Sequence, residues 1–391
     1  MAVTGITLAN GVAFGIAYTF GTFFKAMATD FGVGSGSTAL IFGVTLLFFF
    51  GGGIFAGPFA DRLGDARPLL VLGGAMLVAG LLATSAADRL WVGVLSYGVG
   101  VGVGGGLFVA PLTAMVGRIF VRRRAAAMAF IATGNGLGTL IFSPLSESII
   151  DADGWRRAYV VLAVIAAVVL TASTVMLMGY PPTADGTTAD SVSALSTVRR
   201  FVGDRRALAM WGAGVLMSIG LFIAFTFIVP FAVEAGVTSA GASRLVGVVG
   251  LSSIAGRVGL MVVAGRLGPV RLMQLTLAVQ PIAYAVWLIA GSRYVLLVMF
   301  AVMLGIAYGG FVAVAPEALL HLVGMSGAGM SIGLLFLSFG VGGLIGPPAA
   351  GYLADAVNST STVIGVVIGI VLLGGLVSLA MTGPPAPESG A

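Results

Sequence analysis

Apolar blocks about 20 residues long recur about twelve times along this chain, separated by short polar intervals. A helix needs about 20 predominantly apolar residues to cross the roughly 30 Å hydrocarbon core of a bilayer. Each block therefore predicts one membrane-spanning helix. The predicted spans lie near residues 4–24, 37–60, 68–86, 91–117, 125–149, 157–179, 208–232, 243–264, 271–291, 294–322, 328–352 and 362–382.

The composition supports a membrane protein and excludes several kinds of function. Charged residues make up 8% of the chain, whereas a soluble domain usually carries about 25%. The chain has no Cys and one His, so disulfides, thiolate chemistry and Cys- or His-rich metal sites are not expected. No G-x-x-x-x-G-K-S/T loop occurs, so we expect no ATP-driven step, and no cofactor is expected.

The basic residues lie between the apolar blocks, in a pattern that orients a membrane protein. With both termini in the cytoplasm, twelve Lys and Arg fall in inner loops and six in outer loops, which leaves Arg257 inside a block. Cytoplasmic loops carry the excess of Lys and Arg, so we expect a multi-pass protein of the plasma (inner) membrane with cytoplasmic termini. The net charge of +5 then reflects orientation in the lipid bilayer, and nucleic acid is not an expected partner. The first block begins at Met1 without a basic region or cleavage site, which predicts a span and not a signal peptide.

The longest polar interval, residues 180–206, divides the predicted spans into two sets of six. It contains a Pro-Pro pair, a Ser/Thr-rich piece and two Arg-Arg pairs. We expect one helical bundle over residues 1–179, a cytoplasmic linker over 180–207 and a second bundle over 208–391. A monomer is the favoured oligomeric state.

The two halves also resemble each other in sequence. A shift of 204 residues aligns residues 60–67 with 264–271 and residues 136–144 with 340–348, and a shift of 205 aligns residues 109–111 with 314–316. Three matches in order at nearly the same spacing indicate an internal repeat. Parallel repeats of this kind place a binding site near the bilayer midplane, between the halves.

The loop after the second predicted span carries a recognisable motif. Residues 57–67 (GPFADRLGDAR) resemble the G-x-x-x-D-R-x-G-R-R signature of the major facilitator superfamily, and residues 264–271 are the second-half copy. The resemblance implies an all-helical membrane protein with two pseudo-symmetric six-helix bundles and alternating access. It also implies that the loop residues latch the inner gate: Asp61, Arg62, Gly64, Arg67, Arg266 and Arg271.

A narrower resemblance links the chain to the monocarboxylate and oxalate/formate carriers. Residues 10–31 are similar to their first span, residues 119–134 to the entry of their fifth span, and Arg257 stands where they place an anion-binding Arg. Two positions depart from the pattern: Tyr18 stands where some members have Lys, and Ser253 where some have Asp. Proton coupling through that Lys/Asp/Arg set is therefore not carried over.

Arg257 is also informative without the resemblance. A guanidinium near the centre of a membrane helix costs about 2.5–3.5 kcal/mol on translocon scales, so such residues have a partner or a water-filled cavity and usually a function. We expect Arg257 to bind the carboxylate of a small organic anion. The alternative is a structural Arg that pairs with a backbone carbonyl or a nearby acid.

Several polar residues are candidates to line the cavity with Arg257. Ser253 lies four residues earlier on the same helix face, Tyr18 offers a phenol donor, and Asn135 and Tyr308 lie at membrane depth. For each, an inter-helix hydrogen bond or simple packing is the alternative. A single cation matches a single carboxylate, which favours a monovalent acid of lactate or pyruvate size.

Glu317 and His321 form an i, i+4 pair and are candidate carriers of a coupling proton, since burial raises the pKa of a carboxyl. The alternative is a structural pairing of Glu317 with Arg266 or Arg271. The sequence thus predicts a secondary transporter working by proton symport or anion exchange. A drug/proton antiporter of the same superfamily and a non-transporting receptor are the alternatives. An enzyme is not expected, because the sequence has no paired intramembrane Asp, no H-E-x-x-H motif and no Ser/His pair with a plausible geometry.

Overall fold

The computed structural model describes residues 2–119, 124–179, 194–324, 328–357 and 359–381, without the side chains of residues 58, 61, 62, 117–119, 124–126, 129 and 261–266. All regular elements in these ranges are helical. In the first half they are α1 (Ala2–Tyr18), α2 (Phe20–Phe31), α3 (Ser35–Leu63), α4 (Arg67–Ser85), α5 (Leu90–Gly93), the π-helical η1 (Val94–Val101), α6 (Gly102–Ile119), α7 (Arg124–Asp153) and α8 (Trp155–Met178). The second half contains α9 (Ala194–Gly203), α10 (Arg205–Glu234), α11 (Ser239–Leu267), α12 (Pro269–Ala290), α13 (Tyr294–Val323), α14 (Ala328–Val357), α15 (Thr360–Ser378) and the short η2 (Leu379–Met381).

These helices account for the predicted spans. In the described ranges, nine helices are long and apolar enough to cross a membrane, and the pair α1 and α2, bent by 40°, makes a tenth. The 30-residue α7 and the 29-residue α11 occupy the places of the fifth and eighth predicted spans. The chain is a multi-pass membrane protein, and the predicted all-helical fold is confirmed.

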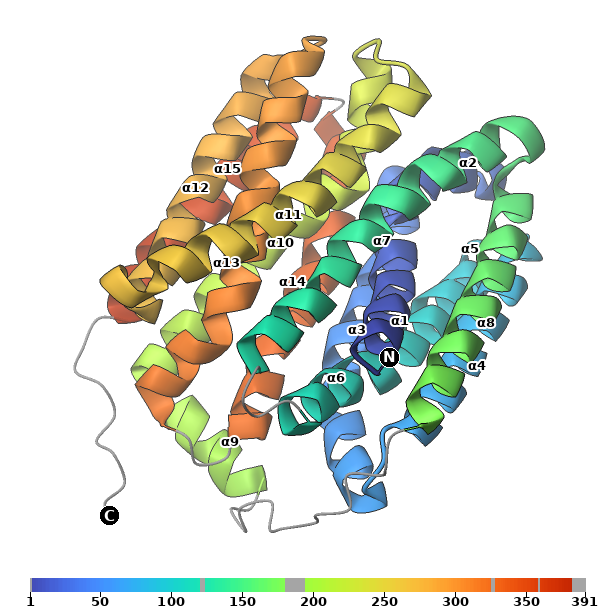
Figure 1. The fold of residues 1–391 in the computed structure, drawn as a ribbon. Helices are drawn as coiled ribbons and strands as arrows, with labels where there is room; N and C mark the ends of the chain where they lie inside the picture. The colour runs from blue at the N-terminus through green and yellow to red at the C-terminus, as the bar shows by residue number, and fades with distance from the viewer. Residues whose placement is uncertain (1, 120–123, 180–193, 325–327, 358, 382–391) are drawn as a thin grey trace, which may run out of the picture.

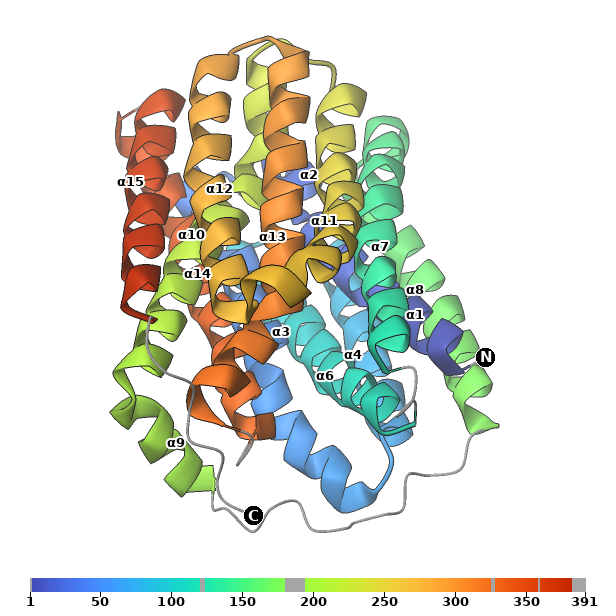
Figure 2. The same ribbon diagram turned by 60° about the vertical axis from the view of Figure 1, so that its left-hand side comes forward.

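The helices pack in two groups that meet along three lines. Within the first group α1 packs on α7 and α8, and α3 and α4 pack on α6. Within the second, α11 and α12 pack on α13, and α10 packs on α14 and α15. Figures 1 and 2 show the blue-to-green group (α1–α8) beside the yellow-green-to-red group (α9–α15). The groups meet where α3 lies against α14, α7 against α11 and α2 against α10. We call the end of the molecule at which α9 lies the linker end, and the opposite end the hairpin end.

Small residues allow this close packing, since no hydrophobic force joins helices inside lipid. A Cβ on Gly102 would lie 2.7 Å from the carbonyl oxygen of Thr45, so α6 can approach α3 only with glycine there. Between the halves, a Cβ on Gly250 would lie 2.7 Å from the carbonyl oxygen of Gly136. Glycine therefore sets the distance between α7 and α11, the two helices that carry the central candidate residues.

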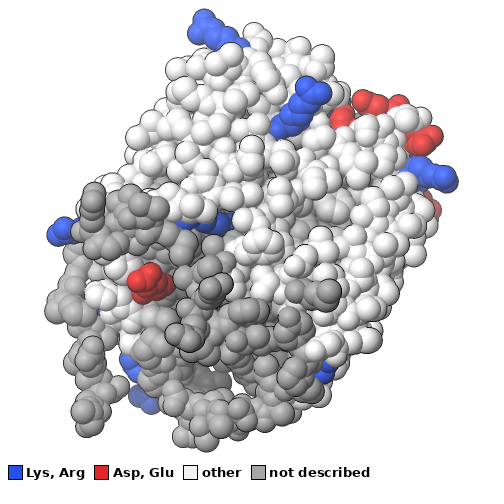
Figure 3. Space-filling model, viewed as in Figure 1, with Lys and Arg blue, Asp and Glu red and all other residues white. Residues whose placement is uncertain are grey.

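The surface is consistent with a lipid environment. Large apolar side chains such as Val168, Ile289 and Leu373 are exposed on α8, α12 and α15. Figure 3 shows a broad uncharged band on the face in view, with charged side chains gathered toward its two ends. Exposed apolar surface of this extent suits hydrocarbon and not water.

Part of the predicted linker is helical. Residues 194–203 form α9, and α10 begins at Arg205, where Asp204 caps it by accepting from the backbone N–H groups of Arg206 at 2.8 Å and Ala207 at 3.4 Å. The guanidinium of Arg200 donates to the carbonyl of Val323, and that of Arg206 to Leu322 at 3.2 Å. These bonds attach the linker to the end of α13.

Candidate functional site

Arg257 lies between the two halves of the molecule. It belongs to α11, its side chain is 4% exposed, and its Nη1 donates to the backbone carbonyl of Ala132 on α7. Its Cζ stands 5.7 Å from the centre of the Tyr308 ring on α13, within reach of a cation–π contact. Among the described residues, Nε and Nη2 have no hydrogen-bond partner.

The carbonyl partner agrees with the alternative of a purely structural Arg. However, it leaves Nε and Nη2 of the guanidinium without a hydrogen-bond partner among the described residues. A buried donor without a partner costs about 1–3 kcal/mol, and more when it is charged. Nε and Nη2 lie on the same edge of the planar group, which is the fork that a carboxylate can accept from bidentately. No described carboxylate lies within ion-pair distance of Arg257. The group can therefore accept an anion from outside the protein.

Tyr18 and Tyr308 join the two halves beside Arg257. Their hydroxyl oxygens are 3.2 Å apart, and both side chains are buried. Phe14 and Phe225 pack against the Tyr18 ring at centroid distances of 5.5 and 4.5 Å. Only one of the two hydroxyl hydrogens is used between them, so the pair keeps one donor for a third group.

Asn135 lies three residues after Ala132 on α7, so the two share a helix face. Its side chain is half-buried, and its Oδ1 has no partner among the residues described. Ser253, one turn before Arg257, is buried, but its hydroxyl donates to the carbonyl of Gly250 at 2.7 Å. The structure thus brings Arg257, Tyr308, Tyr18 and Asn135 to one region, whereas the Ser253 hydrogen is used within its own helix.

Asn10 is a buried polar residue that the sequence interpretation did not include among the site residues. It lies on α1, is 2% exposed, and its Nδ2 donates to Oγ1 of Thr113 on α6 at 3.4 Å. Its Oδ1 has no partner in the described part of the chain. The signal was present, because a polar amide inside an apolar block is costly wherever it occurs.

The gate loops are only partly visible. Gly64 and Gly268, which the internal repeat aligns, both have a positive φ, of 63° and 72°, which favours glycine. The Nε of Arg67 lies 2.7 Å from Oδ2 of Asp65, and Arg271 is exposed. The side chains of Asp61, Arg62 and Arg266 lie outside the described residues. The latch role of this set stays a prediction.

Glu317 and His321 lie apart from the Arg257 group. Glu317 follows Tyr308 by nine residues on α13, about 13 Å along a helix axis toward the linker end. Both side chains are exposed. The burial on which their proton-coupling role depended is therefore not found in this state.

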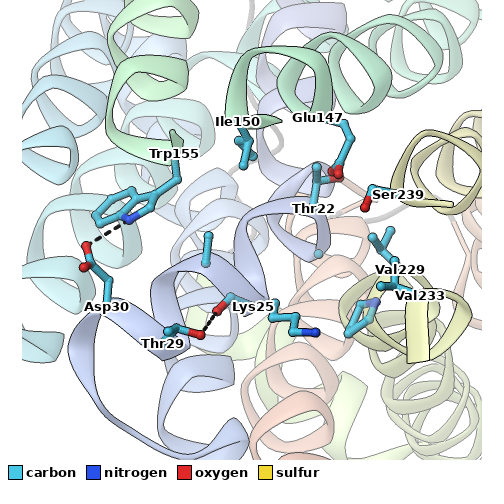
Figure 4. Close-up of a pocket in the computed structure, with 13 residues that line it drawn as sticks. Thr22, Lys25, Thr29, Asp30, Glu147, Ile150, Trp155, Val229, Val233 and Ser239 are labelled. Atoms are coloured by element: carbon cyan, nitrogen blue, oxygen red, sulfur yellow. Dashed lines mark hydrogen bonds between the residues drawn. The ribbon is translucent and has the colours of Figure 1, made fainter. Parts of the chain in front are cut away.

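At the hairpin end, polar contacts and a cavity lie between the halves. The Asp355 carboxylate at the end of α14 accepts from the backbone N–H groups of Ser35 and Gly36 at the start of α3, both at 3.1 Å. A cavity of about 390 Å³ lies beside α2, α7, α8, α10 and α11 (Figure 4). Lys25 and Glu147 line it, and the latter faces Ser239 on α11.

Hydrogen bonds beside this cavity join the two halves. Thr22, which lines the cavity, hydrogen-bonds Ser143 of α7 at 3.0 Å between the hydroxyl oxygens. Ser143 in turn contacts the carbonyl oxygen of Ser243 on α11 at 3.2 Å. In this state the halves are thus held together on the hairpin side of the central residues.

Comparison with known proteins shows the family to which the chain belongs. The family model of the Major Facilitator Superfamily matches residues 6–292, so the chain belongs to that superfamily of membrane proteins.

Within the superfamily the chain is similar to monocarboxylate transporters. It is 30% identical to monocarboxylate transporter 3 of Rattus norvegicus over 362 residues, which cover 90% of this chain and 73% of that protein. It is 28% identical to monocarboxylate transporter 4 of the same species over 375 residues, covering 90% and 76%. Among solved structures, a mutant of the nucleoside transporter NupG superposes with a TM-score of 0.79 at 14% identity, covering 98% of this chain and 100% of that one. At that identity the likeness shows the fold alone.

Proposed function

We propose that the protein is a secondary transporter of a small monocarboxylate, of lactate or pyruvate size, that works by alternating access. The observation that carries the proposal is the Arg257 guanidinium, buried between the halves with Nε and Nη2 unpartnered in the described structure. The similarity to proteins named monocarboxylate transporters supports the substrate class. Coupling is by proton symport or anion exchange, in the plasma membrane with both termini cytoplasmic.

The charge of the site favours one carboxylate over two. Residues 327–352, which include most of α14, contain no Lys or Arg, so that helix supplies no second cation. A dicarboxylate would leave one charge uncompensated in a low-dielectric environment, which costs several kcal/mol. A monocarboxylate bound by Nε and Nη2 leaves no uncompensated negative charge.

The test is uptake of labelled lactate, pyruvate and acetate into proteoliposomes, with and without a pH gradient. We compare the native chain with Arg257→Lys and Arg257→Ala, and use Arg293→Ala, an exposed Arg at the hairpin end, as the matched control. Loss of one partner of a buried charged hydrogen bond costs about 2–5 kcal/mol, so uptake by Arg257→Ala should fall at least about 30-fold. Arg257→Lys should recover little, because an ammonium offers no planar fork.

The same measurements distinguish between the two coupling mechanisms and between the alternative functions. Stimulation by an inwardly directed proton gradient indicates symport, and stimulation by internal unlabelled acid indicates exchange. Equal uptake by the native chain and Arg257→Ala contradicts the site. Transport of lipophilic cations alone indicates a drug/proton antiporter, and binding of acid without flux indicates a receptor.

A further inference from the structure

We propose that Asn10, held by Thr113, makes this transporter prefer 2-hydroxy acids to 2-oxo acids and to unsubstituted acids. The inference rests on the proposed function and names the chemistry of the substrate more narrowly. It depends on the direction in which the Asn10 amide is fixed, on its depth in the molecule and on what its free oxygen can accept.

The hydrogen bonds of Thr113 fix the orientation of the Asn10 amide. The Thr113 hydroxyl donates its single hydrogen to the carbonyl of Val109, with an oxygen–oxygen distance of 2.7 Å. It can therefore only accept from Asn10, and the Asn10 group that faces it at 3.4 Å must be the Nδ2 donor. The Oδ1 acceptor of Asn10 consequently points to the other side, where it has no partner among the described residues.

Asn10 lies at nearly the same depth as Ala132, the residue whose carbonyl accepts from Arg257. Helices α1 and α7 run in the same direction, with Gly11 against Gly134 and Gly15 against Gly138. Asn10 is one residue before Gly11, and Ala132, whose carbonyl holds Arg257, is two residues before Gly134. The two positions therefore differ by about one residue, or about 1.5 Å along the helix axis.

The free polar atoms at this depth form a complementary set. Nε and Nη2 of Arg257 are donors, whereas Oδ1 of Asn10 and Oδ1 of Asn135 are acceptors, and none has a partner in the described ranges. A carboxylate satisfies the donors but cannot satisfy the acceptors, since it has no hydrogen to give. A hydroxyl group next to the carboxylate supplies that hydrogen.

The other acid classes fit less well. A 2-oxo group brings a second acceptor against Asn10, and an unsubstituted acid brings nothing, so in both cases the buried oxygen stays unpaired. A site that hydrogen-bonds a substrate hydroxyl discriminates strongly against the analogue without it, because its own polar group is left unsatisfied. We expect the KM for lactate to be at least about tenfold lower than the KM for pyruvate or propionate.

The experiment measures KM for lactate, pyruvate and propionate with the native chain, Asn10→Leu and Thr113→Val. Asn10→Leu should bring the lactate-to-pyruvate ratio close to one while propionate uptake persists. Thr113→Val keeps the volume but frees the amide to turn and present Nδ2, so the ratio should shift toward pyruvate. The control is Thr174→Val on α8, a Thr that also donates to the carbonyl four residues earlier, and it should leave the ratio unchanged.

The outcomes separate the inference from the proposed function. If the native chain takes up no acid, both are overturned. If it takes up acids with a ratio that neither Asn10→Leu nor Thr113→Val alters, the function stands and the inference is overturned. If Asn10→Leu does not fold, Thr113→Val decides alone: a shifted ratio supports the role of Asn10, and an unchanged ratio contradicts it.

Discussion

Asp355, at the end of α14, caps a helix in the opposite half, since its carboxylate accepts from the backbone N–H of Ser35 at the start of α3 at 3.1 Å. A negative charge at a helix N-terminus is favoured by the helix dipole. The contact exists only while the two halves are together at the hairpin end. It therefore stabilises that closed state and not the state in which this end is open.

Replacing Asp355 should open the hairpin end more often. Loss of a cap costs about 1 kcal/mol, which is about fivefold in the open-to-closed equilibrium. Because the chain has no native Cys, the readout is labelling of Ser143→Cys, a position buried in this state, by an impermeant maleimide. Labelling should be about fivefold faster with Asp355→Ala than without it. Asp88→Ala removes an exposed acid between α4 and α5 and should have no effect; equal rates in all three proteins exclude the cap as a latch.

The tyrosine pair should contribute to substrate affinity as a unit. Tyr18→Phe and Tyr308→Phe each remove one hydroxyl but keep the ring, so the cation–π contact to Arg257 survives in Tyr308→Phe. A hydrogen bond is worth about 0.5–1.5 kcal/mol, which predicts a KM for lactate about 2- to 12-fold higher in either variant. The double variant should be less affected than the product of the two effects, since the groups share one bond. Multiplicative effects would show that the hydroxyls act independently.

Close packing between α11 and α13 should make Gly309 intolerant of a methyl group. A Cβ on Gly309 would overlap the carbonyl oxygen of Ser253, one turn before Arg257. Gly309→Ala should therefore lower the melting temperature by several degrees and reduce uptake, because α13 must move away with Tyr308. Gly369→Ala on α15, where a Cβ meets nothing within 4 Å, is the control and should keep both values. A stable, active Gly309→Ala would contradict this packing.

Asp204 should make folding stability depend on acid pH. Burial favours the neutral carboxyl, but hydrogen bonds from the Arg206 side chain and from the backbone of Arg206 and Ala207 prevail and lower the pKa of Asp204. A lowered folded-state pKa stabilises the protein fully above the unfolded pKa, about 3.9, and this contribution is lost as pH falls through the folded value. The melting temperature in detergent should thus fall below about pH 4, and less steeply for Asp204→Asn, which can cap but cannot titrate. The melting temperature of Asp88→Asn should follow the native pH dependence. If that of Asp204→Asn does so as well, Asp204 is not the cause of the acid destabilisation.

Much of the fold follows from local properties of the chain. Whether a block of 20 residues is apolar can be read without knowing its neighbours, so most predicted spans agree with the helices to within about five residues. The first span was predicted too short, because α2 continues to Phe31. The break between α1 and α2 at Thr19 was not anticipated, because it interrupts an apolar block without a proline. The repeat, inferred from a spacing of 204 residues, reappears as glycines with positive φ in equivalent loops.

The site depends on relations between helices, which the sequence does not contain. The cost of a buried cation singled out Arg257, but its partner Ala132 follows from the approach of α7 and α11 at Gly136 and Gly250. Glu317 and His321 share a helix face, yet the rotation of α13 leaves that face exposed. Asn10 was overlooked because its role depends on a hydroxyl of α6, a helix far from it in sequence.

The bond between Arg257 and Ala132 uses a main-chain oxygen, and every amino acid carries that same atom. No point substitution in α7 can delete this acceptor; a mutation can only shift the helix that presents it. Without substrate, the protein thus has a hydrogen bond between its two halves that does not depend on the identity of residue 132. Under the proposed function, an anion that draws the guanidinium away from this oxygen would weaken the contact between the two halves and so couple substrate binding to their separation.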